Sequence, residues 1–141
     1  MPLHALVVHA AVVFGPLAAL TALVYAAVPR WRDRFRLPMV GLAVVGTLSV
    51  IAAYVSGSDL LENNPALVQK RFVATHQERA GLLLWLVLAF GPVALATGWL
   101  HTRSGPLRTA AQVLLGVLAL AVLVQVVLVG DAGARAMWQG L

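Results

Sequence analysis

The chain of 141 residues has no cysteine and few charged side chains. The missing thiols exclude disulfides, thiolate metal ligands, covalent attachment of a c-type haem and cysteine nucleophiles. Only 11% of the residues are Asp, Glu, Lys or Arg, whereas an average soluble domain has about 25%. Together with a mean hydropathy of +0.90, this shortage of charge predicts a membrane protein.

Charged residues are missing altogether from four segments, 3–28, 37–58, 80–100 and 109–130. Each has at least 21 residues, and about 20 helical residues cross a bilayer core of about 30 Å. We therefore predict one membrane domain over 1–141, an all-α integral-membrane four-helix up-and-down bundle with an outer loop at 59–79. Too few residues remain for a separate catalytic domain, so we expect no turnover by this chain alone.

Arginine is concentrated in the two short connections between these segments. Residues 29–36 contain four arginines and one aspartate, and Arg103 and Arg108 separate the third and fourth segments. By the positive-inside rule both connections are cytoplasmic, and the N- and C-termini are extracytoplasmic. Orientation then accounts for the net charge of +5, so we expect contact with the lipid bilayer and no nucleic-acid partner.

The segment 14–21 in the first span recurs as 90–97 in the third, with five identities in eight residues. Two interpretations stay open. The chain is a duplicated helical hairpin with a pseudo-two-fold axis along the membrane normal, or residues common in membrane helices have converged. In both cases Pro16 and Pro92 remove a backbone hydrogen bond and are expected to kink their helices.

Four histidines are the side chains with obvious metal or redox competence. His4 and His9 lie at the outer start of the first span, and His76 lies just before the third. His101 follows 25 residues after His76, about 37 Å away if the segment is helical, so we expect a solvated residue at the cytoplasmic interface. The other three share the outer side.

His9 lies within an apolar run, where an ionisable side chain needs a partner and is expected to face the bundle interior. A bound metal would satisfy it, and so would a hydrogen bond to a backbone carbonyl, Ser56 or Gln125. The first and third spans of an up-and-down bundle are diagonal, so their histidines would point at one another. This geometry suits a b-type haem, which needs no cysteine tether.

Two pairings of the histidines remain open. Measured from the two Gly-Pro sequences, the depth of His76 matches His4 to about 6 Å and His9 to about 13 Å. Burial, in contrast, favours His9. We expect His76 and one of the two to ligate iron, while the other bonds a propionate or Glu78. The alternative is a small copper, zinc or iron site made by His4, His76 and an oxygen ligand, for which the candidates are Glu78, Asp59 and Asp131.

Four sequence motifs resemble a known family. The opening Pro2-Leu3-His4-Ala5-Leu6-Val7-Val8-His9 resembles the H-P-x-x-V-H-F-P start of bacterial four-span membrane proteins with the domain of unknown function twenty-two thirty-one, especially their actinobacterial branch. Ser56-Gly57, Thr75-His76-Gln77-Glu78 and residues 130–138 resemble its Thr-Gly, its third-span histidine and its glycine-rich ending. The resemblance implies a bacterial inner-membrane location and a cytochrome-like or redox-associated role.

The chain departs from this family pattern at three places. Ala5 replaces a proline, Ala10-Ala11 replaces Phe-Pro, and Gln139-Gly140 stands where the family has a late histidine. The first helix is therefore expected to start more regularly, and no ligand is expected near residue 139.

The glycine-rich ending also has a structural interpretation. Gly130 and Gly133 would let the chain leave the fourth helix and turn back, with Asp131 capping the next turn. Arg135 would then pair with Asp131 or with a haem propionate.

These observations predict a membrane haem b protein that transfers electrons near the extracytoplasmic face, to a redox or complex-forming membrane partner. A non-catalytic accessory or assembly subunit is the alternative, and homodimerisation is left open. A transporter is disfavoured because none of the four spans carries Asp, Glu, Lys or Arg.

Overall fold

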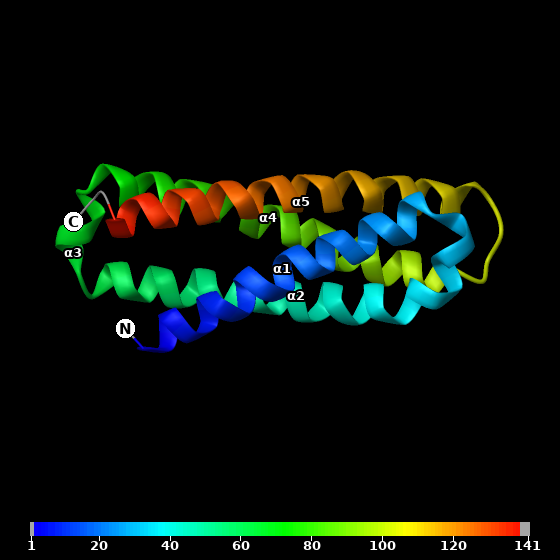
Figure 1. Cartoon of the computed structure of the whole chain (residues 1–141), viewed down its shortest axis with the longest axis horizontal. Coiled ribbons are helices and arrows are strands. Elements are labelled where there is room, and N and C mark those ends of the chain that lie inside the picture. The colour runs from blue at the N-terminus through cyan, green and yellow to red at the C-terminus, as the bar shows by residue number, and fades with distance from the viewer. Residues whose placement is uncertain (1, 139–141) are drawn as a thin grey trace.

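The computed structural model describes residues 2–138, and in this range the chain forms helices and no strand. The long helices are α1 (Pro2–Ala27), α2 (Arg32–Glu62), α4 (Arg71–Leu100) and α5 (Pro106–Trp138). Two short helices, η1 (Pro29–Trp31) and α3 (Pro65–Val68), lie in the connections. All four long helices are long and apolar enough to cross a membrane (Figure 1). The predicted all-α membrane bundle is confirmed.

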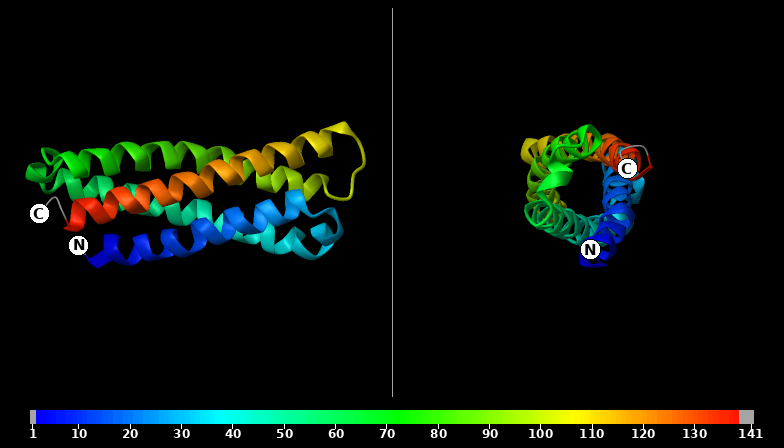
Figure 2. Two further views of the ribbon diagram at one scale, coloured as in Figure 1. Left: turned by 45° about the horizontal axis from the view of Figure 1, so that its top comes forward. Right: turned by 90° about the vertical axis from the view of Figure 1, so that its left-hand side faces the viewer.

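The helices form a ring in which each long helix packs against two others. α1 packs against α2 and α5, and α4 packs against the same two helices, so α1 and α4 are diagonal, as Figure 2 shows end-on. The most extensive packing lies within the hairpins α1–α2 and α4–α5. The predicted diagonal placement of the first and third spans is confirmed.

The two ends of the bundle differ in composition. One end, here called the terminal end, carries both ends of the described chain and α3 (Figure 1). The opposite end, called the arginine end, carries η1, the start of α2 and the α4–α5 connection. Six of the ten basic residues of the chain belong to the arginine end, namely Arg30, Arg32, Arg34, Arg36, Arg103 and Arg108.

Small residues line the interior and bring the helices close together. Six of the fully buried side chains are alanines, and the largest buried ones are Tyr25, Phe90 and Met39. A Cβ atom added at Gly46 would lie 2.9 Å from the carbonyl oxygen of Phe14, so glycine is required where α2 crosses α1. Large aliphatic side chains instead cover the outer surface, as expected of helices that face lipid.

The two Gly-Pro sequences occupy equivalent places in the ring. Gly15 of α1 packs against Val126 of α5, and Gly91 of α4 packs against Thr47 of α2. A two-fold axis along the bundle would exchange α1 with α4 and α2 with α5, which also exchanges these contacts. Any ring of four antiparallel helices has these two kinds of contact, so the packing is compatible with both a duplicated hairpin and convergence. Both helices continue through their prolines.

The helices extend beyond the four predicted spans. Most of 59–79 is helical, because α2 continues to Glu62, α3 follows, and α4 begins at Arg71. The predicted turn at 130–138 is wrong, since α5 runs through both glycines to Trp138. Asp131 is bonded to Arg135 one turn later instead of capping a new helix, and buried Ala132 anchors this turn to the bundle. Gln139-Gly140 lie outside the described residues.

Candidate functional site

His4 is held at the terminal end by the neighbouring helix α2. Its Nδ1 lies 2.7 Å from Ser56 Oγ, and the same hydroxyl donates to the carbonyl oxygen of Ala53 at 3.0 Å. Because the serine proton is used in the second bond, Nδ1–H of His4 is the donor in the first. The neutral ring then carries its lone pair on Nε2.

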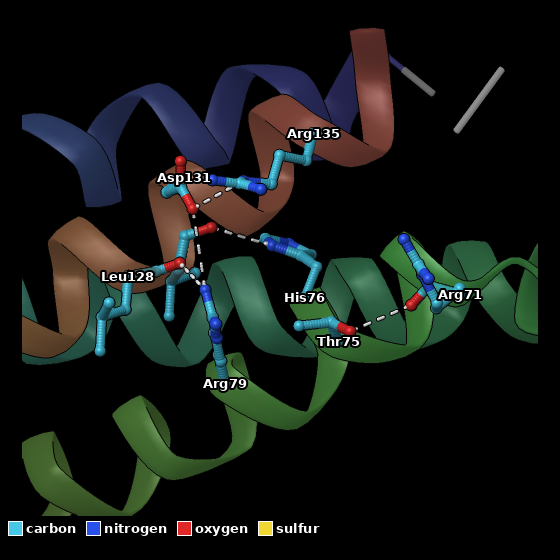
Figure 3. Close-up of polar contacts among 8 residues, drawn as sticks. Arg71, Thr75, His76, Arg79, Leu128, Asp131 and Arg135 are labelled. Atoms are coloured by element: carbon cyan, nitrogen blue, oxygen red, sulfur yellow. Dashed lines mark hydrogen bonds and ion pairs between the residues drawn. The ribbon is translucent and has the colours of Figure 1, made fainter. Parts of the chain in front are cut away.

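His76 is held in the same way by α5. Its Nδ1 lies 3.1 Å from the backbone carbonyl oxygen of Val129. Figure 3 shows the His76 side chain pointing from α4 toward α5. A carbonyl oxygen only accepts, so Nδ1 carries the proton and Nε2 carries the lone pair. Within residues 2–138, the Nε2 atoms of His4 and His76 form no hydrogen bond with the protein.

Each of these imidazoles lies against a glycine of the helix that orients it. A Cβ atom at Gly57 would lie 3.1 Å from Cε1 of His4, and a Cβ atom at Gly133 would lie 3.1 Å from Cε1 of His76. Both distances are tighter than ordinary van der Waals contact. The absence of a side chain at these two positions therefore lets the rings approach their partner helices.

The two histidines come from diagonal helices, His4 from α1 and His76 from α4, and both lie toward the terminal end of the bundle. Each imidazole packs against the neighbouring helix that orients it, His4 against α2 and His76 against α5. The pairing of His4 with His76 that the depth count favoured stays a prediction, and the structure places both side chains toward the same end.

The His9 side chain lies on the exposed surface of α1 and not in the bundle interior. Its Nδ1–H donates to the carbonyl oxygen of Ala5 at 2.6 Å. The expectation that His9 faces the interior is wrong, and helix geometry explains why. His9 follows His4 by five residues, about 140° around a helix, so it turns away when His4 faces α2. Its own helix supplies the partner, while Gln125 donates to the carbonyl oxygen of Arg79.

A cluster of three charged side chains, Arg79, Asp131 and Arg135, lies near His76, as Figure 3 shows. Asp131 Oδ2 accepts from Arg135 Nε at 3.0 Å and lies 3.9 Å from Arg79 Nη1. Arg79 Nη1 also donates to the carbonyl oxygen of Leu128 at 3.2 Å. These side chains border a cavity of about 220 Å³ between α4 and α5. Arg135 thus makes the ion pair with Asp131, one of the two partners expected for it.

The carboxylates proposed as oxygen ligands do not gather around the histidine pair. Asp59 and Glu78 are exposed, and Asp131 is paired with arginine. In the described part of the chain, no group of three or more His, Asp or Glu side chains is arranged to hold a metal ion.

The expectation of a solvated His101 is wrong. Its side chain is only 10% exposed, and both ring nitrogens are hydrogen-bonded. Nε2–H donates to Asp33 Oδ1 at 2.6 Å, and Nδ1 accepts from the Tyr25 hydroxyl at 2.7 Å. The Tyr25 partner is fully buried, whereas the Asp33 side chain, in the first turn of α2, is 99% exposed.

Sequence reasoning missed the residues that orient the histidines. Ser56-Gly57 and Gly133 were visible as small residues in motifs, but their contact with His4 and His76 depends on helix rotation. The carbonyl group of Val129 has no signature in the sequence, because every residue has a carbonyl group.

Comparison with known proteins places the chain in one family. A family model described as "Predicted membrane protein (DUF2231)" matches residues 1–140. Searches among curated proteins and among solved structures found no match.

Proposed function

The chain belongs to the DUF2231 family of predicted membrane proteins, and we propose that it binds one b-type haem through His4 and His76 and transfers electrons. The observation that supports this proposal is that the two imidazoles have the same tautomer and the same kind of hydrogen bond. Both hold a proton on Nδ1 through a hydrogen bond to a neighbouring helix, and both leave Nε2 for a ligand.

This arrangement is typical of histidines that bind metals. A ligating imidazole usually donates its other N–H to a carbonyl, carboxylate or water, which fixes the tautomer and the ring orientation. Ser56 and Val129 would serve this purpose here. The donor set therefore fits haem iron, which accepts histidine as an axial ligand.

Other residues at the terminal end would complete the binding site. Arg79, three residues after His76 on α4, and Arg135 of α5 border the cavity between these helices and would hold the carboxylate groups of the haem by charge-assisted hydrogen bonds. Gly57 and Gly133 would keep the two imidazoles against their partner helices. When bound, the haem would supply one-electron redox chemistry, and the protein would supply its ligands, its orientation and an apolar surrounding.

The distribution of charge supports an extracytoplasmic position for this site. The arginine end has six basic residues and one acidic residue, whereas the rest of the chain has four basic and four acidic residues. The positive-inside rule then directs the arginine end to the cytoplasm and the two histidines to the opposite face. We place the chain in a bacterial inner membrane with both termini outside.

The proposal is tested by the absorption spectrum of the protein purified in mild detergent, with haem supplied during expression. We expect a Soret band and sharpened bands after dithionite reduction. His4→Ala and His76→Ala should each remove most of this absorbance, and His9→Ala should retain it. His9→Ala is the matched control, because it removes an exposed imidazole from the same helix end as His4.

Three outcomes would contradict the proposal that haem binds through His4 and His76. A folded, colourless protein that also fails to take up added haem would favour an accessory or assembly subunit. Stoichiometric copper, zinc or iron without porphyrin would favour the small metal site. Equal absorbance in His76→Ala and His9→Ala would show that the bound haem does not use the proposed ligands.

A further inference from the structure

A groove of about 500 Å³ lies between α1 and α5 near the arginine end. Its lining changes along its length from polar to apolar. Arg32, Arg108, Thr109 and Gln112 line the polar part, while Gly116, Val117 and Leu120 belong to the apolar part. The groove is thus amphipathic, and its polar part is nearer to the membrane boundary that the arginines indicate.

The polar part carries positive charge that the described protein does not neutralise. Neither Arg32 nor Arg108 forms an ion pair with any Asp or Glu between residues 2 and 138. Arg32 is held in place by donating Nε to the carbonyl oxygen of Tyr25 at 2.9 Å and Nη2 to that of Ala26 at 2.7 Å. Its guanidinium is therefore oriented by backbone while its charge stays available to an anion.

An unsatisfied hydrogen-bond donor of Arg108 independently indicates that an acceptor binds here. Its Nε is buried and has no hydrogen-bond partner in the described chain, although Nη1 donates weakly to the carbonyl oxygen of His101 at 3.4 Å. Leaving a buried charged donor unsatisfied is costly, so an acceptor at this position would be stabilising. Arg108 also lies in the first turn of α5, where the helix dipole favours negative charge.

We propose that this groove binds one anionic phospholipid, independently of the haem site. The lipid phosphate would lie between Arg32 and Arg108, where two guanidiniums offer charge-assisted hydrogen bonds. An acyl chain would follow the apolar part past Gly116 and Val117, where the absence of a side chain at Gly116 keeps α5 close to Ala26 of α1. Basic pockets between membrane helices are known binding sites for acidic lipid headgroups.

Native mass spectrometry of the full chain measures the retention of lipid directly. The protein is released from mixed micelles containing equal amounts of phosphatidylglycerol and phosphatidylcholine. We expect one phosphatidylglycerol molecule to be retained in preference to phosphatidylcholine. Arg108→Gln should weaken this retention about fivefold or more, whereas Arg34→Gln, which removes an equal charge from an exposed position at the same end, should not.

A second pair of variants tests the apolar part without changing charge. Val117 is 60% exposed and lines the groove, so Val117→Trp should obstruct the acyl chain and lower retention. Val124→Trp adds the same bulk to an exposed position of α5 outside the groove and should leave retention unchanged. Circular dichroism before the measurement establishes that each variant is helical.

Several results would overturn the proposal. One is equal retention of the two lipids by the unmodified protein, and another is an equal loss in Arg108→Gln and Arg34→Gln. Full retention in Val117→Trp would exclude the acyl path. Binding of millimolar inorganic phosphate without any retention of phosphatidylglycerol would show that the arginines bind free phosphate rather than a phospholipid.

Discussion

The two ends of the bundle hold their histidines in opposite ways. At the arginine end, His101 bonds through both ring nitrogens, to Tyr25 and Asp33. At the terminal end, His4 and His76 each bond through Nδ1 and leave Nε2 for a ligand. A histidine with two protein partners ties helices together, whereas a histidine with one partner is oriented and still able to bind. The comparison therefore separates the structural imidazole of His101 from those of His4 and His76, and His9, which also bonds through Nδ1 alone, differs from this pair in being exposed.

The largest expected effect distinguishes these roles directly. His76→Ala should abolish nearly all haem absorbance, because it removes one proposed axial ligand. His101→Ala should retain the band, since it acts at the opposite end of the bundle. Spectra normalised to protein concentration make the measurement. Loss of the band in both variants, with helicity intact, would contradict the separation of roles.

The free energy of unfolding should depend on His101, the histidine that haem absorbance does not depend on. His101→Ala removes a hydrogen-bond partner of the buried Tyr25 hydroxyl, whereas the Asp33 carboxylate is 99% exposed and stays hydrated. We expect a loss of about 1–3 kcal/mol in the free energy of unfolding, whereas His9→Ala should change it by less than about 0.5 kcal/mol. Unfolding in mixed detergent and SDS, followed by circular dichroism, measures both. Equal stability of the two variants would show that the His101 contacts contribute nothing.

A smaller effect is expected from the group that orients His4. Ser56→Ala removes the acceptor of the Nδ1–H bond, so the ring loses its preferred tautomer and orientation. We expect haem affinity to fall about tenfold, as is usual when a group supporting a metal ligand is removed. Titration of the haem-free protein with haemin measures the change. Ser49→Ala, a serine on the same helix that bonds only within it, is the control and should bind haem normally.

The smallest effect is expected where a ring lies against glycine. Gly133→Ala would place a Cβ atom 3.1 Å from Cε1 of His76, and the imidazole would shift by a few tenths of an ångström. We expect a displaced Soret maximum and a loss in haem-binding free energy of less than about 1 kcal/mol. Gly130→Ala, where an added Cβ meets no atom within 4 Å, should leave the spectrum unchanged. Identical spectra of the two variants would remove the steric role of Gly133.

Much of the architecture was predictable because uncharged length is a strong signal in membrane proteins. Four segments without Asp, Glu, Lys or Arg predicted four antiparallel helices, which places the first and third on a diagonal and His4 and His76 at one end. The rotation of each helix was harder to predict. His9 was expected inside the bundle from burial alone, but a carbonyl group one turn earlier satisfies its imidazole at the surface.

Other errors came from signals that have a different meaning inside a bundle. Gly130 and Gly133 suggested a helix end, yet α5 continues, and Gly133 instead makes room for an imidazole from another helix. His101 was expected in solvent because its distance from His76 along the helix puts it at the opposite interface, away from the other histidines. Its two partners are 68 and 76 residues away in the chain, and only the packing of α1 and α2 against α4 and α5 brings them to it.

The division of the histidine pair between two hairpins has a consequence for assembly. His4 and Ser56 belong to the first hairpin, and His76 and Val129 belong to the second, so neither half of the protein holds both imidazoles. Fragments separated at residues 63–64 would each insert as a pair of helices with only one of the two proposed ligands. A haem bound by both histidines would then link the two fragments, and co-expressed halves would show haem absorbance only when they associate.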